Sequence, residues 1–151
     1  MIPEGYIGPY IATNLIAAGL IVAAIKWPRR TRILFAFIFL LAGLVNAYTA
    51  ITDPKDYLNY REFAVLDTYK EFIDGFFKKH TQPCVLAIAL GQLITGILLL
   101  MKNDRLRGLG VIGGAIFFVA IIPLGIGSAF PCPLLSTVAL NFMAYRLSGN
   151  H

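Results

Sequence analysis

Charged residues are scarce in this chain, and they are confined to short patches. They make up 14% of the 151 residues, and none occurs in the 38 residues from Gly108 to Tyr145. A soluble helical domain would place charges on the wet face of every helix, so this distribution excludes an ordinary soluble fold. Apolar blocks separated by charged connectors are typical of a chain that folds in lipid.

The sequence motifs of self-contained enzymes are missing as well. There is no GxSxG, no HExxH and no glycine-rich phosphate or dinucleotide loop. The two histidines, His80 and His151, are too few for a catalytic triad inside the apolar blocks or for a metal site. The sequence therefore predicts no catalytic residue and no metal, and it favours a protein without catalytic machinery of its own.

Two further functional classes are disfavoured by where the charges are. The interiors of the apolar blocks contain no acidic or basic residue, whereas proton relays and ion pathways usually need such groups within the membrane. The basic residues do not form a soluble patch with base-stacking aromatics, so we expect no nucleic-acid partner.

Five apolar blocks predict five membrane spans in a single domain, residues 1–151. A span needs about 20 residues, and the last charge-free stretch would measure about 57 Å as one helix, which is too long. Its Gly- and Pro-rich middle predicts two short helices, with one span plus a re-entrant piece as the alternative. The predicted spans are residues 8–26, 33–52, 83–101, 108–123 and 133–147.

The fold class expected from this pattern is an all-α integral membrane protein. It consists of a four-helix transmembrane bundle, an additional N-terminal span and an amphipathic outer interfacial helix. With five spans, one side of the membrane receives eight basic residues and one acidic residue, and the other receives five basic and seven acidic residues. Because Lys and Arg favour the cytoplasm, we predict an outside N-terminus and a cytoplasmic C-terminus, in the inner (plasma) membrane of a bacterium.

The connector of residues 53–82, here called the outer segment, is charged and rich in aromatics. At 100° per residue its apolar side chains share an arc of about 140°, which indicates an amphipathic helix. One interpretation is a helix lying in the membrane interface and capping the bundle. The other is a lid over a lateral opening or a docking surface for another subunit, with Phe72, Phe76 and Phe77 at the interface.

Cys84 and Cys132 are the only cysteines, and both are expected at the outer ends of spans. Three interpretations are open: a structural disulfide, two unpaired thiols in an apolar setting, and a working redox pair. A CxxC motif, which would favour redox exchange, is absent.

Neutral polar side chains inside the spans are the candidates for ligand binding. Asn46, Gln92 and Asn141 each carry an amide that must find a partner in an apolar helix, and Tyr48 lies near the first of them. Most such groups make interhelical hydrogen bonds. Alternatively, these four line a pocket for a quinone, a lipid headgroup or a sterol-like molecule; no other cofactor is evident.

Small residues predict close helix packing. Gly110 and Gly114 form a GxxxG step, and Gly91 and Gly96 allow backbone approach on the third span.

Two stretches, RILFAFIFLLAGLVNA and LGQLITGILLLMKNDRLRGLGV, resemble the DoxX-like family of small helical membrane proteins. Ala42-Gly43-Leu44 matches the family's AGL motif, and Gly96 with the following Leu run matches the pattern before its basic turn. The chain departs from the family where Asn46 replaces a common Lys and Gln92 stands near an acidic position. The resemblance implies a four-helix bundle, with the N-terminal span outside it, and a link to thiosulfate–quinone oxidoreductase subunits.

Three functions follow from these observations. The first is an accessory or redox/quinone-linked subunit of a membrane complex, whose partners are the lipid bilayer and other subunits, with a homo-oligomer also allowed. The second is a binding protein for a small hydrophobic molecule (quinone, lipid or sterol-like). The third is a thiol–disulfide membrane oxidoreductase that uses Cys84 and Cys132.

Overall fold

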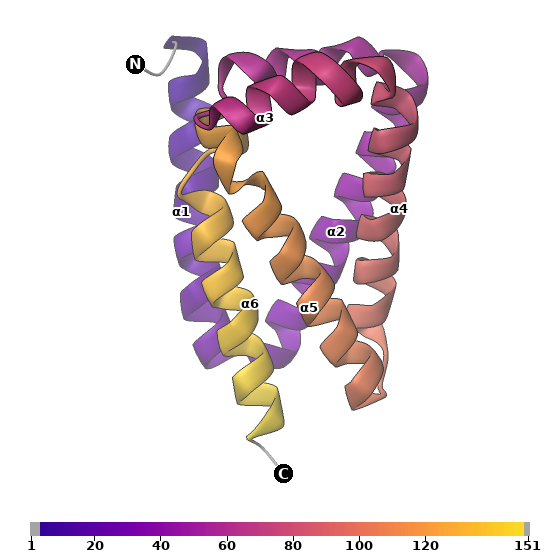
Figure 1. Cartoon of the computed structure of the whole chain (residues 1–151). Helices are drawn as coiled ribbons and strands as arrows, with labels where there is room; N and C mark the ends of the chain where they lie inside the picture. Colours follow the sequence, from indigo (N-terminus) through magenta and orange to yellow (C-terminus); the bar gives the residue numbers. More distant parts are fainter. Residues whose placement is uncertain (1–3, 150–151) are drawn as a thin grey trace.

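The chain runs back and forth through five long helices, and a shorter helical segment crosses one end of them (Figure 1). The computed structural model describes residues 4–149, except for the side chains of residues 4 and 6, and within that range it contains helices and no strand. The long helices are α1 (Glu4–Lys26), α2 (Pro28–Thr52), α4 (Thr81–Leu100), α5 (Asp104–Ile121) and α6 (Cys132–Ser148).

The helix boundaries follow from local chemistry. Pro28 stands in the first turn of α2, where its missing N–H is not needed, so the chain turns sharply after α1. The side chain of Asn103 caps α5 by accepting hydrogen bonds from the backbone N–H groups of Arg105 and Leu106 at 2.9 and 3.2 Å. The first of these turns separates the first predicted span from the second, and the second turn separates the third span from the fourth.

The five long helices correspond to the five predicted spans within a few residues. Among the described residues, four segments have the length and apolar composition to cross a membrane: Ile7–Lys26, Pro28–Thr52, Thr81–Leu100 and Asp104–Ser128. The fifth predicted span, α6, has 17 residues and is not among them. The last of the four segments includes η3 (Ile122–Ser128), a 3-10 segment in which Gly125 has a φ of 57°. After η3 the chain reverses, and α6 runs antiparallel to α5 (Figure 1). The prediction that the charge-free stretch forms two helices is confirmed.

The two ends of the bundle differ in charge. The turn between α1 and α2, the turn between α4 and α5, and the end of α6 lie at one end, here called the basic end (Figure 1). The outer segment and the start of α1 lie at the opposite end, here called the outer end. The basic and acidic residues are therefore divided between the ends as the five-helix prediction requires.

Glycines hold α2 and α4 close together. A Cβ on Gly43 would lie 2.9 Å from the Ala89 carbonyl oxygen, and a Cβ on Gly96 would lie 2.9 Å from the Ala36 carbonyl oxygen. The prediction for Gly96 is thus confirmed, whereas a Cβ on Gly91 would meet nothing within 4 Å.

The core of the bundle lies between α2, α5 and α6. Phe35 and Phe39 of α2 are fully buried, and the Phe39 ring lies 5.3 Å from the Phe118 ring. A Cβ on Gly114 would lie 2.9 Å from Leu140 and 3.0 Å from Phe39. The GxxxG step therefore serves packing, since it lets the large rings fit between the helices.

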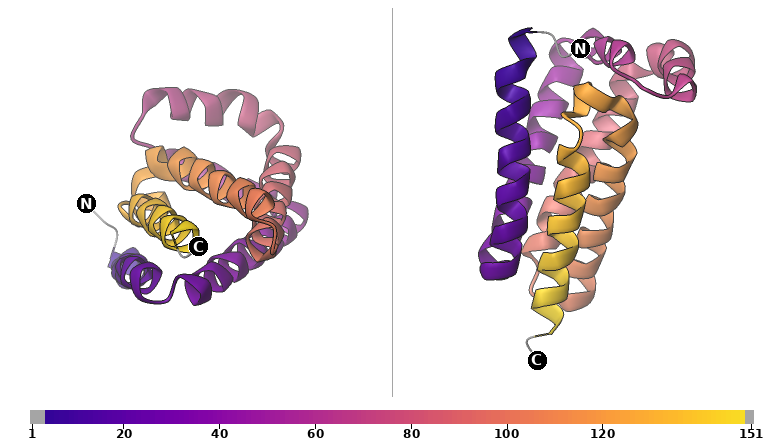
Figure 2. Two further views of the ribbon diagram at one scale, coloured as in Figure 1. Left: turned by 90° about the horizontal axis from the view of Figure 1, so that it is seen from below. Right: turned by 90° about the vertical axis from the view of Figure 1, so that its left-hand side faces the viewer.

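The outer segment consists of three short helical pieces. These are η1 (Pro54–Glu62), α3 (Asp67–Phe72) and η2 (Ile73–Phe77), the last with π-helical hydrogen bonding. They pass across the outer end and project beyond the side of the bundle before reaching α4 (Figure 2).

This arrangement corrects the expectation of one regular amphipathic helix. Ile73 and Phe77 are 5% and 9% exposed, but Phe72 and Phe76 are 48% and 57% exposed. A π turn contains more residues than an α turn, so the side chains around it no longer follow a constant 100° spacing. Phe77, predicted at an interface with Phe72 and Phe76, is instead a core residue.

Candidate functional site

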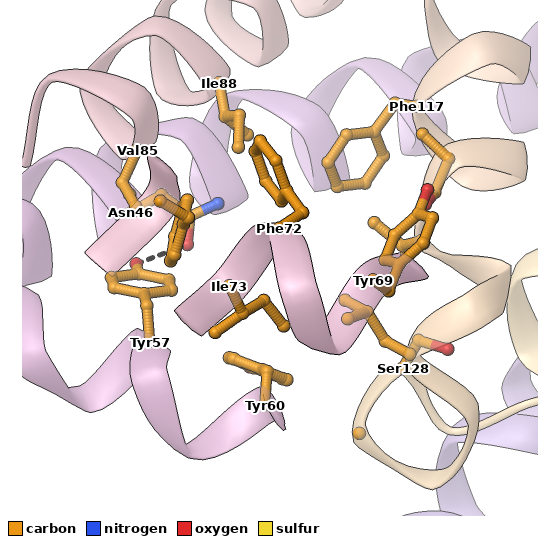
Figure 3. A pocket seen from close by; sticks show the side chains of 15 residues that line it. Asn46, Tyr57, Tyr60, Tyr69, Phe72, Ile73, Val85, Ile88, Phe117 and Ser128 are labelled. Atoms are coloured by element: carbon orange, nitrogen blue, oxygen red, sulfur yellow. Dashed lines mark hydrogen bonds between the residues drawn. The ribbon is translucent and has the colours of Figure 1, made fainter. Parts of the chain in front are cut away.

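A cavity of about 400 Å³ lies between the outer segment and the outer halves of α4 and α5 (Figure 3). Its walls are mostly apolar and aromatic, as is usual for sites that take small hydrophobic ligands. The lining residues are Asn46, Tyr57, Tyr60, Tyr69, Phe72, Ile73, Phe77, Val85, Ile88, Phe117, Ala120, Ile121, Leu124, Gly127 and Ser128.

Aromatic rings from two directions shape this cavity. The outer segment supplies five of them, and the rings of Tyr57 and Tyr60 stack with their centroids 6.2 Å apart. Phe117 of α5 faces them from the bundle side (Figure 3). Because rings tolerate flat or branched apolar molecules on their faces, the walls suit a hydrophobic body more than a charged one.

One polar network stands at the edge of this apolar space. Asn46 of α2 donates from Nδ2 to Oε1 of Gln92 on α4 at 2.7 Å, and the Tyr57 hydroxyl donates to Asn46 Oδ1 at 2.8 Å. Gln92 is 3% exposed, so its amide lies behind Asn46 and holds it in place. Hydrogen bonds between these three side chains thus connect α4, α2 and the outer segment.

The Tyr57 phenol keeps its hydrogen throughout the ordinary pH range. Burial raises the pKa of Tyr57 above its usual value, and this effect exceeds the opposing influence of a hydrogen bond with Thr49. Tyr57 therefore remains a hydrogen-bond donor to Asn46 at neutral pH.

Two hydrogen bonds attach the outer segment to the end of α5 and the start of η3. The Tyr69 hydroxyl donates to the Ala120 carbonyl oxygen at 2.7 Å, and the Val65 backbone N–H donates to the Pro123 carbonyl oxygen at 2.9 Å. Glycines make this approach feasible, since a Cβ on Gly125 would lie 2.9 Å from the Phe63 carbonyl oxygen and one on Gly127 2.9 Å from the Tyr60 ring. The cavity thus has a fixed lid on this side.

A second contact holds the pieces of the outer segment to each other. Arg61 Nε lies 2.7 Å from both carboxylate oxygens of Asp74, and the two side chains are about half exposed. An exposed ion pair contributes about 0–1 kcal/mol, so it orients η1 against η2 without dominating their stability.

The structure brings together two of the four predicted ligand-binding residues. Asn46 lines the cavity and Gln92 bonds to it. Tyr48 is 70% exposed and does not line the cavity. Asn141 donates to the Thr137 carbonyl oxygen of its own helix at 2.9 Å, so its amide is satisfied locally and is not part of this site.

Most residues of the lid and of the α5 wall were not predicted from the sequence. Tyr57 and Tyr60 are three residues apart, a spacing that places side chains on one face of a 3-10 helix, but a 3-10 helix was not expected there. The sequence gives no partner for the Tyr69 hydroxyl, and nothing distinguishes Phe117 within a continuously apolar helix.

Both cysteines are free, which decides against the disulfide interpretation. Cys84 packs against the cluster of buried residues beneath the outer segment, which includes Ile73, Phe77 and Val85. Cys132 has its Sγ 3.8 Å from Ser136 Oγ at the start of α6. The two thiols have separate neighbours, so nothing in this arrangement favours a redox pair.

The chemical groups of the cavity are an amide, hydroxyls and aromatic rings. Among the side chains that the structure describes, no three His, Cys, Asp or Glu residues come together in a way that would hold a metal ion. The arrangement can bind a molecule through hydrogen bonds and ring contacts.

No family model matches the sequence, no curated protein is significantly similar to it, and no solved structure matches its fold significantly.

Proposed function

We propose that this chain is an integral membrane protein that binds a small hydrophobic molecule in the cavity at its outer end. The observation that carries the proposal is the position of Asn46, a polar side chain at the wall of an otherwise apolar and aromatic space. Its orientation is fixed by Gln92 and Tyr57. An ordered amide beside apolar walls is the usual arrangement for orienting a hydrophobic ligand.

The position of the cavity supports access from lipid. It lies under the outer segment, and Phe72 both lines it and is 48% exposed on the surface. A molecule dissolved in the outer leaflet would reach the cavity beside Phe72 without crossing water. Quinones, lipids and sterol-like molecules all partition in this way.

The experiment compares two tryptophan substitutions on α4. Ile88→Trp adds volume at a position that lines the cavity, whereas Leu90→Trp adds it at a position that is 58% exposed and not part of the lining. The unaltered protein and both variants would be purified, and the hydrophobic molecules that copurify with each would be extracted and identified by mass spectrometry. We expect a stoichiometric hydrophobic molecule with the unaltered protein and Leu90→Trp, and its loss with Ile88→Trp. Equal retention by both variants would count against the cavity.

A second candidate function is an accessory subunit of a membrane complex, linked to redox or quinone metabolism. The observation in its favour is the exposed ring stack on the outer segment, in which Phe72 and Phe76 lie 6.0 Å apart and Phe76 and His80 lie 4.6 Å apart. The redox or quinone link itself depends on the DoxX-like resemblance of Ala42-Gly43-Leu44 and the Gly96 region.

Mild detergent extraction followed by affinity purification tests this second function. A stoichiometric membrane partner that is lost in Phe72→Ala/Phe76→Ala, but kept in Phe37→Ala/Leu41→Ala on the exposed face of α2, would support it. Recovery of the chain alone under conditions that preserve known complexes would oppose it.

A further inference from the structure

Four hydroxyl groups line the cavity, those of Tyr57, Tyr60, Tyr69 and Ser128. Three of them donate their hydrogens to protein acceptors. Tyr57 donates to Asn46 Oδ1 at 2.8 Å, Tyr69 to the Ala120 carbonyl oxygen at 2.7 Å, and Ser128 to the Gly125 carbonyl oxygen at 3.0 Å. A carbonyl oxygen cannot donate, so the direction of each bond is fixed. Toward a ligand, these three hydroxyl oxygens can act only as acceptors.

The three hydroxyl oxygens differ in how many further hydrogen bonds they can accept. The Tyr57 oxygen also takes part in a hydrogen bond with the Thr49 side chain. The Tyr69 hydroxyl donates to a carbonyl oxygen of α5, and the Ser128 hydroxyl donates to one of η3. Each hydroxyl oxygen keeps lone pairs that can accept a hydrogen bond. These two residues therefore supply the acceptor side of the site.

Asn46 supplies a donor. Its Nδ2 carries two hydrogens, and one of them is used in the 2.7 Å bond to Gln92. Figure 3 shows the amide nitrogen on the side of Asn46 that faces away from the Tyr57 hydroxyl. The second hydrogen of this nitrogen is the donor that Asn46 has for a ligand.

We infer that the ligand carries a hydroxyl group on a hydrophobic body, as an alcohol or a phenol. A carbonyl or ether oxygen would use the Asn46 donor and leave the acceptors at Tyr69 and Ser128 unmatched. A hydroxyl group accepts and donates, so one such group can be bound by either kind of partner, and a molecule with two hydroxyls by both. This inference rests on the proposed function and names the chemical class of the molecule that the cavity binds.

Pairs of probes that differ only in the hydroxyl hydrogen test the inference. 2-Naphthol and 2-methoxynaphthalene represent aromatic bodies, and farnesol and farnesyl methyl ether represent isoprenoid ones. Saturable binding would be measured by calorimetric titration of the protein in nanodiscs, with empty nanodiscs of the same lipid as the blank. A hydrogen bond of ordinary strength makes the alcohol of a pair bind about tenfold more tightly than its ether. The naphthyl and farnesyl pairs together show which body the walls prefer.

Single substitutions show which residues cause the preference for the alcohol over the ether. Tyr69→Phe and Ser128→Ala each remove one acceptor, and we expect at least one of them to reduce the ratio of alcohol affinity to ether affinity. Because both residues line the cavity, this ratio, and not either affinity alone, is the quantity compared. Tyr48→Phe, at a position that is 70% exposed and outside the cavity, is the matched control and should keep the full preference.

The outcomes separate the inference from the proposed function. Equal binding of alcohol and ether, or a preference unchanged by both Tyr69→Phe and Ser128→Ala, overturns the hydroxyl assignment and leaves the binding function standing. No saturable binding of any of the four probes, together with no copurifying molecule, overturns the binding function and the hydroxyl assignment with it.

Discussion

Gly43 on α2 packs directly against Leu93 on α4, and one turn further toward the basic end the relationship is reversed. A Cβ on Gly43 would lie 2.8 Å from Leu93 Cγ, and a Cβ on Gly96 would lie 2.7 Å from Leu40 Cγ. Each helix thus offers a glycine to a leucine of the other, which brings their backbones close enough for dispersion contacts along both helices.

We expect Gly43→Ala and Gly96→Ala each to destabilise the protein by about 1–3 kcal/mol, because the added methyl group overpacks the α2–α4 contact. The backbone carbonyl oxygens of Ala89 and Ala36 would be 2.9 Å from the new Cβ atoms, and they cannot move as a side chain can. Denaturation by SDS titration in mixed micelles gives the free energy of unfolding. Gly91→Ala on α4 meets nothing within 4 Å and should be neutral; a loss of similar size there would show that the packing explanation is wrong.

The buried amide pair makes a second prediction. Gln92→Leu removes the acceptor of Asn46 Nδ2, and we expect a loss of about 1 kcal/mol in the free energy of unfolding. Asn141→Leu serves as the comparison, since Asn141 is exposed and bonds within its own helix. In a double-mutant cycle, Asn46→Leu and Gln92→Leu should be coupled by about 0.5–1.7 kcal/mol, and strictly additive effects would contradict the hydrogen bond.

The long helices were predictable because each is written as an uninterrupted apolar block with charged or Pro/Gly-rich boundaries. The pairing of Asn46 with Gln92 was foreseen only in part. An amide in an apolar helix must find a partner, so the sequence pointed to both residues, but it pointed equally to Asn141, whose partner is a carbonyl oxygen of its own helix.

The lid and the cavity were not predictable to the same extent. The outer segment changes from 3-10 to α to π geometry within 24 residues, Pro54 to Phe77, so a fixed angle per residue misassigned Phe77 to an interface. The cavity itself depends on contacts of the outer segment with α5 and η3, such as that of Tyr69 with Ala120 of α5. These two residues are 51 positions apart, and no periodicity connects them.

Gly125 is the position at which we expect the attachment of the lid to fail first. Its φ of 57° lies in the left-handed region, and a Cβ there would be 2.9 Å from the Phe63 carbonyl oxygen. Gly125→Ala should therefore cost about 1–3 kcal/mol and loosen residues 60–69. Hydrogen exchange of the Val65 amide, which bonds to Pro123, would rise in this variant. Gly108→Ala meets nothing within 4 Å and is the control; unchanged protection at Val65 in Gly125→Ala would contradict the proposed attachment.

Two free thiols are expected in the protein as purified from an oxidising compartment. Cys84 and Cys132 have different neighbours, so alkylation of the denatured protein without reductant should add two labels to the intact mass. Cys84→Ser/Cys132→Ser should keep the ligand occupancy and lose at most about 1–2 kcal/mol in stability, because the change only makes two partly buried positions more polar. A mass two hydrogens lighter with no label would restore the disulfide interpretation.

The charge difference between the ends of the bundle predicts the orientation in the membrane. In the Cys84→Ser/Cys132→Ser background, Lys55→Cys places a thiol on exposed η1 at the outer end, and Lys102→Cys places one in the exposed turn between α4 and α5 at the basic end. Because the side rich in Lys and Arg is retained in the cytoplasm, a membrane-impermeant maleimide applied to intact cells should label Lys55→Cys and spare Lys102→Cys until the membrane is permeabilised. Labelling of Lys102→Cys alone would invert the topology and place the cavity in the cytoplasmic leaflet. Labelling of both in intact cells would mean that the helices α1, α2, α4 and α5 do not cross the membrane as a bundle.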